Sequence, residues 1–227
     1  MKKKFFAGLA AGLFLFGVVQ ISNASVLTFD GLSGYNYQPI NQNYGDSITS
    51  TSDSYGQYLE GNGFTPHINV AYNTVGGNAY LEAWDTDYGN LVNVAYADYD
   101  GGTAEILFTP DYGYEVTINR FDMAGWYLED KTASLIEIVN GAGTTVWSAS
   151  SLFVSGQFGT HSVFFPGITG SELTIRWGND WNIGIDNINF DESRSSEAVP
   201  EPATMLLFGV GLAGLAGYSR RRQAKKK

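Results

Sequence analysis

The sequence predicts an all-β domain, most simply a two-sheet antiparallel β-sandwich with jelly-roll connections. Short β-rich segments recur along the middle of the chain, Gly, Pro and Asn turn signals separate them, and no window has the apolar stripe of an amphipathic helix. A single antiparallel barrel is the alternative. The 227 residues, 44% of them hydrophobic, suffice for one domain with its own core and two tails.

The domain is expected to span residues 25–190. Its strands are expected at Val26–Asp30, Ile68–Asn73, Ala79–Trp84, Leu91–Tyr96, Ala104–Thr109, Tyr114–Phe121, Ser134–Asn140, Thr144–Ser148, His161–Phe165, Glu172–Trp177 and Ile183–Phe190. The clearest pair is the hairpin around Asn140-Gly141, a dipeptide that favours tight turns. Residues 46–63 are polar and weakly patterned, which favours a surface loop or an edge strand.

Charge is strongly segregated along the chain. Of the 13 basic residues only four lie between residues 25 and 198, together with 22 of the 23 acids, so this region has a formal charge of −18. Such a surface repels a phosphate backbone, and nucleic acid is therefore excluded as a partner. The lack of Cys rules out disulfides and thiolate metal sites, and two His disfavour a multi-His centre.

Residues 1–24 have the pattern of a secretory signal peptide. A basic start at residues 2–4 precedes an apolar run at 5–19, and Ser22-Asn23-Ala24 supplies the small residues that signal peptidase recognises. Cleavage after Ala24 is expected during export by the secretion machinery. An uncleaved anchor helix is the alternative, although the run is short for a membrane span.

Residues 199–227 have the pattern of a membrane-associated sorting signal, preceded by a flexible stalk at 191–198. It opens with a structure-breaking triplet, Pro200, Glu201 and Pro202. The uncharged stretch 203–218 is expected to form a transmembrane helix of about 24 Å. A basic cluster follows and is expected to stay cytoplasmic: Arg220, Arg221 and Arg222.

The triplet, the Gly-rich apolar stretch and the Arg cluster, in this order, resemble the PEP-CTERM sorting signal over residues 199–222. The resemblance implies export across a Gram-negative envelope, transient anchoring in the inner membrane and processing by exosortase. It also implies release to the cell surface or matrix and an association with exopolysaccharide. The middle of the chain, around 40–46, 67–71 and 185–190, resembles an uncharacterised β-sandwich domain that recurs in PEP-CTERM proteins.

Carboxylates on the first and last strands suggest a calcium site. Asp186 shares a strand face with Ile188 and Phe190 by the two-residue period, so it needs a partner if that face is buried. Asp30 ends the first strand, and the first and last strands of sandwiches often lie close together. Calcium, which takes oxygen ligands, is thus the candidate metal at Asp30 and Asp186. The alternative is an Asp186 that accepts backbone N–H bonds.

Aromatic side chains provide the candidate glycan contacts. Trp126, Tyr127 and Trp181 are expected to stack on sugar rings, since pyranose C–H faces are apolar. Trp181 lies in a polar loop and is the best single candidate, whereas Trp84 and Trp177 occupy strand positions typical of core residues. Packing within the protein is the alternative for each of them.

Catalytic motifs are missing from the sequence. It has no G-x-S-x-G, no H-E-x-x-H and no phosphate-binding Gly-rich loop, so no catalytic residue is assigned. The prediction is an exported, non-enzymatic surface or matrix protein with a structural or adhesive role linked to exopolysaccharide. The alternative is a secreted glycan-active enzyme that uses an Asp/Glu pair.

Overall fold

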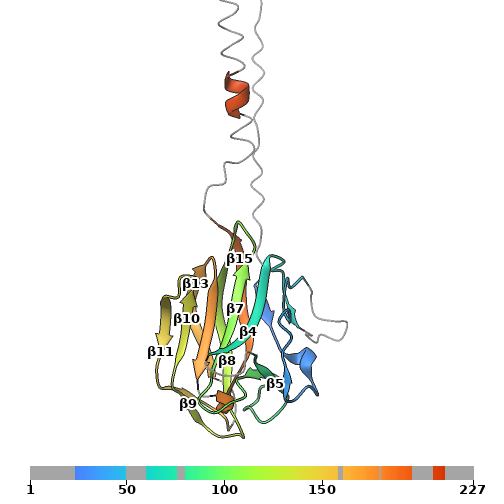
Figure 1. Ribbon diagram of the computed structural model, residues 1–227, viewed down its shortest axis with the longest axis vertical. Helices are drawn as coiled ribbons and strands as arrows, with labels where there is room; N and C mark the ends of the chain where they lie inside the picture. The colour runs from blue at the N-terminus through green and yellow to red at the C-terminus, as the bar shows by residue number, and fades with distance from the viewer. Residues whose placement is uncertain are drawn as a thin grey trace, which may run out of the picture.

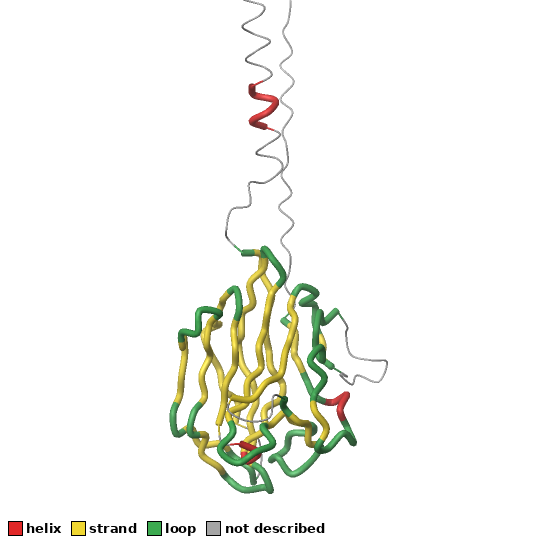
Figure 2. The backbone as a smooth tube through the Cα atoms, viewed as in Figure 1, coloured by secondary structure: helices red, strands yellow, loops and turns green. Residues whose placement is uncertain are grey.

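The computed structural model describes residues 24–49, 60–75, 80–157, 161–178, 180–195 and 207–212. Figure 1 shows the order of the elements, and Figure 2 shows that strands dominate the domain. The all-β prediction is therefore confirmed. The chain crosses repeatedly between two sheets, for example from β7 to β8 and from β14 to β15. The finer jelly-roll assignment stays a prediction.

The larger sheet has the order β13 (His161–Gly170), β8 (Tyr114–Gly125), β15 (Ile183–Arg194), β6 (Val94–Tyr96), β5 (Glu82–Trp84) and β2 (Gln38–Pro39). β1 (Ser25–Leu27) also pairs with β15, and β3 (Gly61–Asn62) pairs with β1. The smaller sheet has the order β11 (Thr145–Ala149), β10 (Ile136–Asn140), β14 (Leu173–Gly178), β7 (Thr103–Pro110) and β4 (Ile68–Val75).

Four further elements complete the described domain. β9 (Lys131–Ala133) and β12 (Leu152–Val154) form a two-stranded sheet, and η1 (Asp30–Leu32) and η2 (Asp180–Asn182) are short 3-10 helices. The expected hairpin is confirmed, because β10 and β11 pair antiparallel on either side of residues 141–144. Asn140 closes the turn by accepting the backbone N–H of Thr144 on its side chain at 2.9 Å.

Alternating strand positions from both sheets meet in one hydrophobic core. Its largest members are fully buried: Phe29, Tyr72, Phe108, Phe121, Trp177 and Phe190. Trp177 also donates its indole N–H to the carbonyl of Ile183 at 3.0 Å, so its polar atom is satisfied inside the core. The sequence-based placement of Trp177 in the core is thus confirmed.

A bulge in β15 changes which residues face the core. Ile183 and Ile185 point into it, but so do Ile188 and Phe190, which have the opposite parity. The switch occurs at Asn187, which has φ 52° and lies where the register with β8 shifts. The prediction that Asp186 shares a face with Ile188 and Phe190 is therefore wrong.

β15 also continues four residues further than expected. The ladder with β8 runs on to Arg194, which pairs with Tyr114, so the strand passes the expected domain end at residue 190. The predicted stalk at 191–198 therefore begins inside the strand. The sequence concealed this because residues 191–194 are polar, and the backbone ladder with β8 that extends the strand leaves no apolar alternation to read.

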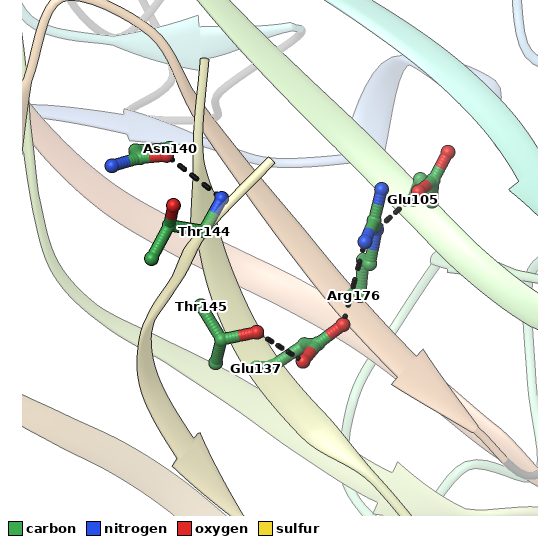
Figure 3. Close-up of polar contacts among 6 residues, drawn as sticks. All are labelled: Glu105, Glu137, Asn140, Thr144, Thr145 and Arg176. Carbon is green, nitrogen blue, oxygen red and sulfur yellow. Dashed lines mark hydrogen bonds and ion pairs between the residues drawn. The ribbon is translucent and has the colours of Figure 1, made fainter. Parts of the chain in front are cut away.

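The outer face of the smaller sheet is polar and is held together by an ionic ladder (Figure 3). Arg176 of β14 lies in register between Glu137 of β10 and Glu105 of β7. Its Nε contacts Glu105, its Nη1 lies 3.5 Å from Glu137, and Thr145 donates to Glu137 at 2.9 Å. This face therefore has few features of a binding surface for apolar groups.

Candidate functional site

The outer face of the larger sheet carries a second apolar cluster, separate from the core. Ala95 and Ala97 point into the core, whereas Val94 and Tyr96 point the other way. The members of this outer cluster are Tyr88, Leu91, Val94, Tyr96 and Ala124, with Trp84 and Trp126 packed against them. Tyr88, Leu91 and Trp126 of this cluster lie outside the named strands, in the segments that follow β5 and β8.

A pocket of about 300 Å³ opens over this cluster. We call it the aromatic pocket, and its lining is Tyr37, Trp84, Tyr88, Tyr96, Asp98, Trp126 and Trp181. The strands β5 and β6 contribute its floor, and η2 and the loops around Tyr37 and Trp126 contribute its walls. Its size is at the lower end of the range typical of small-ligand sites.

Edge-to-face contacts fix the rings of the aromatic pocket. Trp84 is the centre of the arrangement, with ring centroids 4.6 Å from Tyr37 and 4.9 Å from Trp126 at interplanar angles of 78° and 89°. Trp126 is also perpendicular to Trp181, at 6.5 Å and 82°. In each of these pairs the edge of one ring packs against the face of the other, so the contacts hold the rings in fixed orientations around the pocket.

Backbone and side-chain hydrogen bonds hold the walls in place. Trp126 donates its backbone N–H to the carbonyl of Asn182 at 2.9 Å, and the Tyr88 hydroxyl donates to the carbonyl of Trp181. The Trp181 indole N–H donates to Asp100 at 3.0 Å. The two tryptophans are therefore positioned by residues distant in sequence, and they are held before any ligand arrives.

Turns with unusual backbone conformations surround the pocket. Non-glycine residues with positive φ are Tyr37, Asp87, Asn93, Tyr127, Leu128 and Asp180 in this region. Tyr127 and Leu128 are consecutive, at 60° and 56°, and the N–H of Leu128 donates to the carbonyl of Asp87 at 3.2 Å. Bulky side chains seldom adopt this region, and such residues cluster at functional sites.

Two carboxylates lie at one side of the pocket. Glu82 is buried on the outer face of β5 and accepts a hydrogen bond from the Tyr96 hydroxyl at 2.8 Å. Burial raises the pKa of Glu82, and the neighbouring Asp98 raises it further, whereas the bond from Tyr96 lowers it. Asp98 is exposed and lines the pocket, so the pocket presents negative charge beside the aromatic rings.

The structure brings together some of the residues selected from the sequence. Trp126 and Trp181 both line the aromatic pocket, and Tyr127 lies beside Trp126 but is 69% exposed and outside the lining. Sequence reasoning missed Tyr37, Tyr88, Tyr96 and Asp98. It placed Trp84 in the core, but Trp84 packs against the outer cluster instead.

Asp30 lies close enough to Asp186 for its charge to raise the pKa of Asp186. Asp186 is 3% exposed and accepts the backbone N–H of Phe29 at 3.3 Å. Burial raises the pKa of Asp186 well above its usual value, and the charges of Asp30 and Asp122 act in the same direction. No group of three or more His, Cys, Asp or Glu suited to a metal ion occurs among the described residues. Calcium at this position stays a prediction.

The signal and sorting segments lie largely outside the described residues. These include residues 1–23, Pro200, Glu201, Pro202, Arg220, Arg221 and Arg222. Ala24 is the first described residue, directly before β1. Residues 207–212, within the predicted membrane segment, are helical. Within the described ranges we find no helix with the length and apolarity to cross a bilayer.

Comparison with known proteins identifies the C-terminal signal. Residues 198–222 match the model of the PEP-CTERM protein-sorting motif. The chain therefore carries the signal of an exported protein that is anchored at the membrane and then processed by exosortase. No significant match is found among curated proteins.

The solved structures that the chain resembles are only distantly similar to it in sequence and fold. The arabinose-bound MgGH51 α-L-arabinofuranosidase is 10% identical with a TM-score of 0.36, covering 73% of this chain and 28% of that one. The bacteriophage CBA120 tailspike protein 4 domain is 15% identical with a TM-score of 0.31, covering 68% of this chain and 24% of that one. The Podospora anserina GH26-CBM35 β-(1,4)-mannanase is 14% identical with a TM-score of 0.31, covering 59% of this chain and 29% of that one. The chain spans less than a third of each, and these likenesses assign no function.

Proposed function

We propose that this exported protein binds saccharides through the aromatic pocket and has a structural or adhesive role in an exopolysaccharide matrix. The observation that supports the proposal is the lining of the pocket, in which three Trp and three Tyr surround a space of about 300 Å³. Aromatic faces pack against the C–H face of a pyranose, while the nearby carboxylates and indole N–H groups can bond its hydroxyls.

The membrane steps belong to the same proposal. A signal peptide is cleaved after Ala24, and a helix within residues 203–218 anchors the chain in the inner membrane. Exosortase then acts at Pro200, Glu201 and Pro202, and the domain reaches the cell surface or matrix. Fractionation of cells with and without exosortase, with mass spectrometry of both mature termini, tests this route. An unprocessed C-terminus in both strains contradicts it.

Trp181→Ala tests the saccharide site. Trp181 is 37% exposed at the rim, so its truncation should leave the fold intact while it removes one stacking surface. We expect retention on saccharide affinity gels to weaken by about tenfold. Tyr112→Ala is the matched control, because Tyr112 is 96% exposed and does not line the pocket. Equal retention of Trp181→Ala and wild type overturns the site.

A glycan-active enzyme is the second candidate, and Glu82 is the observation that favours it. Its raised pKa suits a general acid, and Asp98 is the nearby second carboxyl group. The carboxyl groups of most glycosidases stand about 5–10 Å apart on either side of the scissile bond, so this function also requires that Glu82 and Asp98 flank the ligand. Release of reducing sugar that Glu82→Gln abolishes would establish the enzyme, and binding without release supports the non-enzymatic role.

A further inference from the structure

The charge around the aromatic pocket has the same sign throughout. Asp98 lines the pocket, Glu82 lies beside it, and Asp100 holds the Trp181 indole at 3.0 Å. The four basic residues of the domain do not line it. Of the ion pairs found among the described residues, Lys131 pairs with Glu129 and Arg176 with Glu105 and Glu137. Within the described residues, no ion pair involves Asp98, Glu82 or Asp100.

This combination constrains the ligand chemistry. A neutral sugar that covers Asp98 removes water from the carboxylate without supplying a positive charge to compensate. An anionic sugar is repelled by all three carboxylates. An ammonium group satisfies both features of the pocket at once, because carboxylates pair with it and the faces of Trp and Tyr rings attract cations.

We propose that the aromatic pocket selects saccharides that carry a free ammonium group, such as de-N-acetylated hexosamines, and that Asp98 pairs with this group. The proposal rests on the saccharide-binding function above and specifies its ligand class. The sugar ring stacks on the exposed rim formed by Trp181 and Tyr37, which are 37% and 64% exposed. The ammonium then points inward to Asp98, with Trp84 and Trp126 beside it.

Calorimetry on the full chain in detergent tests the proposal with four probes. These are a glucosamine tetramer, its fully N-acetylated form, a neutral glucose tetramer and choline. We expect the glucosamine tetramer to bind at least about tenfold more tightly than either other tetramer. Because the preference is electrostatic, it should shrink as salt concentration rises. It should also disappear at a pH high enough to deprotonate the amine.

Asp98→Asn separates charge recognition from stacking. This variant keeps the size of the side chain, and we expect it to bring the glucosamine tetramer to the affinity of the neutral ones. Asp111→Asn is the charge-matched control, since Asp111 is exposed and does not line the pocket. It should keep the preference.

The remaining outcomes distinguish the two proposals. Equal binding of all three tetramers overturns the ammonium selectivity and leaves the saccharide function standing. Binding of choline alone, or of no probe, overturns both. A preference that survives in Asp98→Asn overturns the role of Asp98.

Discussion

The carboxylate of Asp186 accepts the backbone N–H of Phe29 at 3.3 Å, and this bond joins residues 157 positions apart in sequence. β1 pairs with β15 from Ser25 to Leu27 and then leaves it, so the N–H of Phe29 has no partner in the ladder. Asp186 supplies the missing acceptor from the bulge. A side chain thereby closes the contact between the first and last strands of the domain.

Asp186→Asn should stabilise the domain at neutral pH. Burial raises the pKa of Asp186, so the folded state holds a proton that the unfolded chain releases above about pH 4. Stability should therefore be highest in acid and fall as pH rises toward the raised pKa. Asn removes the ionisable group and keeps one oxygen for Phe29, so we expect a gain of about 1–3 kcal/mol at pH 7.

Urea unfolding at several pH values measures this effect. Asp186→Ala is the comparison, because it leaves the N–H of Phe29 buried without an acceptor and should cost about 1–3 kcal/mol. Burial also raises the pKa of Asp30 and of Glu82, so a shallower pH dependence should persist in Asp186→Asn. A melting temperature that millimolar Ca²⁺ raises in wild type but not in Asp186→Asn would instead assign calcium to this site.

Arg176→Met should destabilise the domain only modestly. The substitution leaves Glu105 and Glu137 near one another with no cation between them, on a face where the three side chains are partly exposed. We expect a loss of about 1 kcal/mol at low ionic strength and a smaller one in high salt, because salt screens the repulsion. Chemical denaturation at two salt concentrations measures it.

The ladder can be tested further by neutralising the acids. Adding Glu105→Gln and Glu137→Gln to Arg176→Met removes the repulsion, so most of the lost stability should return. If the triple variant is less stable than Arg176→Met by itself, the carboxylates have another structural role and the ladder is not the reason for the loss.

Glu192→Ala should loosen the far end of β15. Glu192 accepts the backbone N–H of His67 at 2.9 Å and contacts its ring nitrogen at 3.0 Å, and the His67 ring stacks on Tyr114 at 3.8 Å. Loss of both contacts should cost about 1–3 kcal/mol. Hydrogen exchange at residues 191–194 should show faster opening. Glu192→Gln keeps an acceptor for the N–H and should lose less, and equal losses in both variants would contradict the hydrogen-bonding role.

The strands were predictable from sequence to the extent that local pattern determines them. The β10–β11 hairpin follows from its turn residues, and the burial of Trp177 follows from alternation with Leu173 and Ile175. Alternation fixes which residues share a face but not which face is the core. Trp84 alternates like a core residue and packs on the opposite side, because the larger sheet has apolar clusters on both faces.

The pocket was less predictable because long-range contacts build it. Tyr37 and Trp126 come from two separate loops and Trp181 from η2, and no local pattern indicates that they meet. The bulge at Asn187 has a weak local signal, since Asn tolerates positive φ better than most residues. A one-residue bulge reverses the face of every later side chain in the strand. Asp186, before the bulge, therefore lies on the opposite face from Ile188 and Phe190, which alternation alone would place beside it.

Gly184→Val should damage the aromatic pocket from below. A Cβ at Gly184 would lie 2.5 Å from Cγ2 of Val94 and 3.0 Å from Cδ1 of Tyr88, so the outer cluster rests directly on the β15 backbone. A larger side chain pushes Val94 and Tyr88 outward and disturbs the bond from Tyr88 to the Trp181 carbonyl. We expect a loss of about 1–3 kcal/mol in stability and about tenfold in saccharide affinity.

Val94→Ala should rescue Gly184→Val, because the smaller side chain returns the space that the new one takes. Gly178→Ala is a control in the other sheet: Gly178 lies in β14, outside the lining of the pocket, and its added Cβ would approach the Ser134 hydroxyl at 2.8 Å. Calorimetry with the saccharide and thermal melting together separate the two effects. Wild-type affinity in a folded Gly184→Val would show that the floor of the pocket does not position Trp181, and loss of affinity that Val94→Ala restores would show that it does.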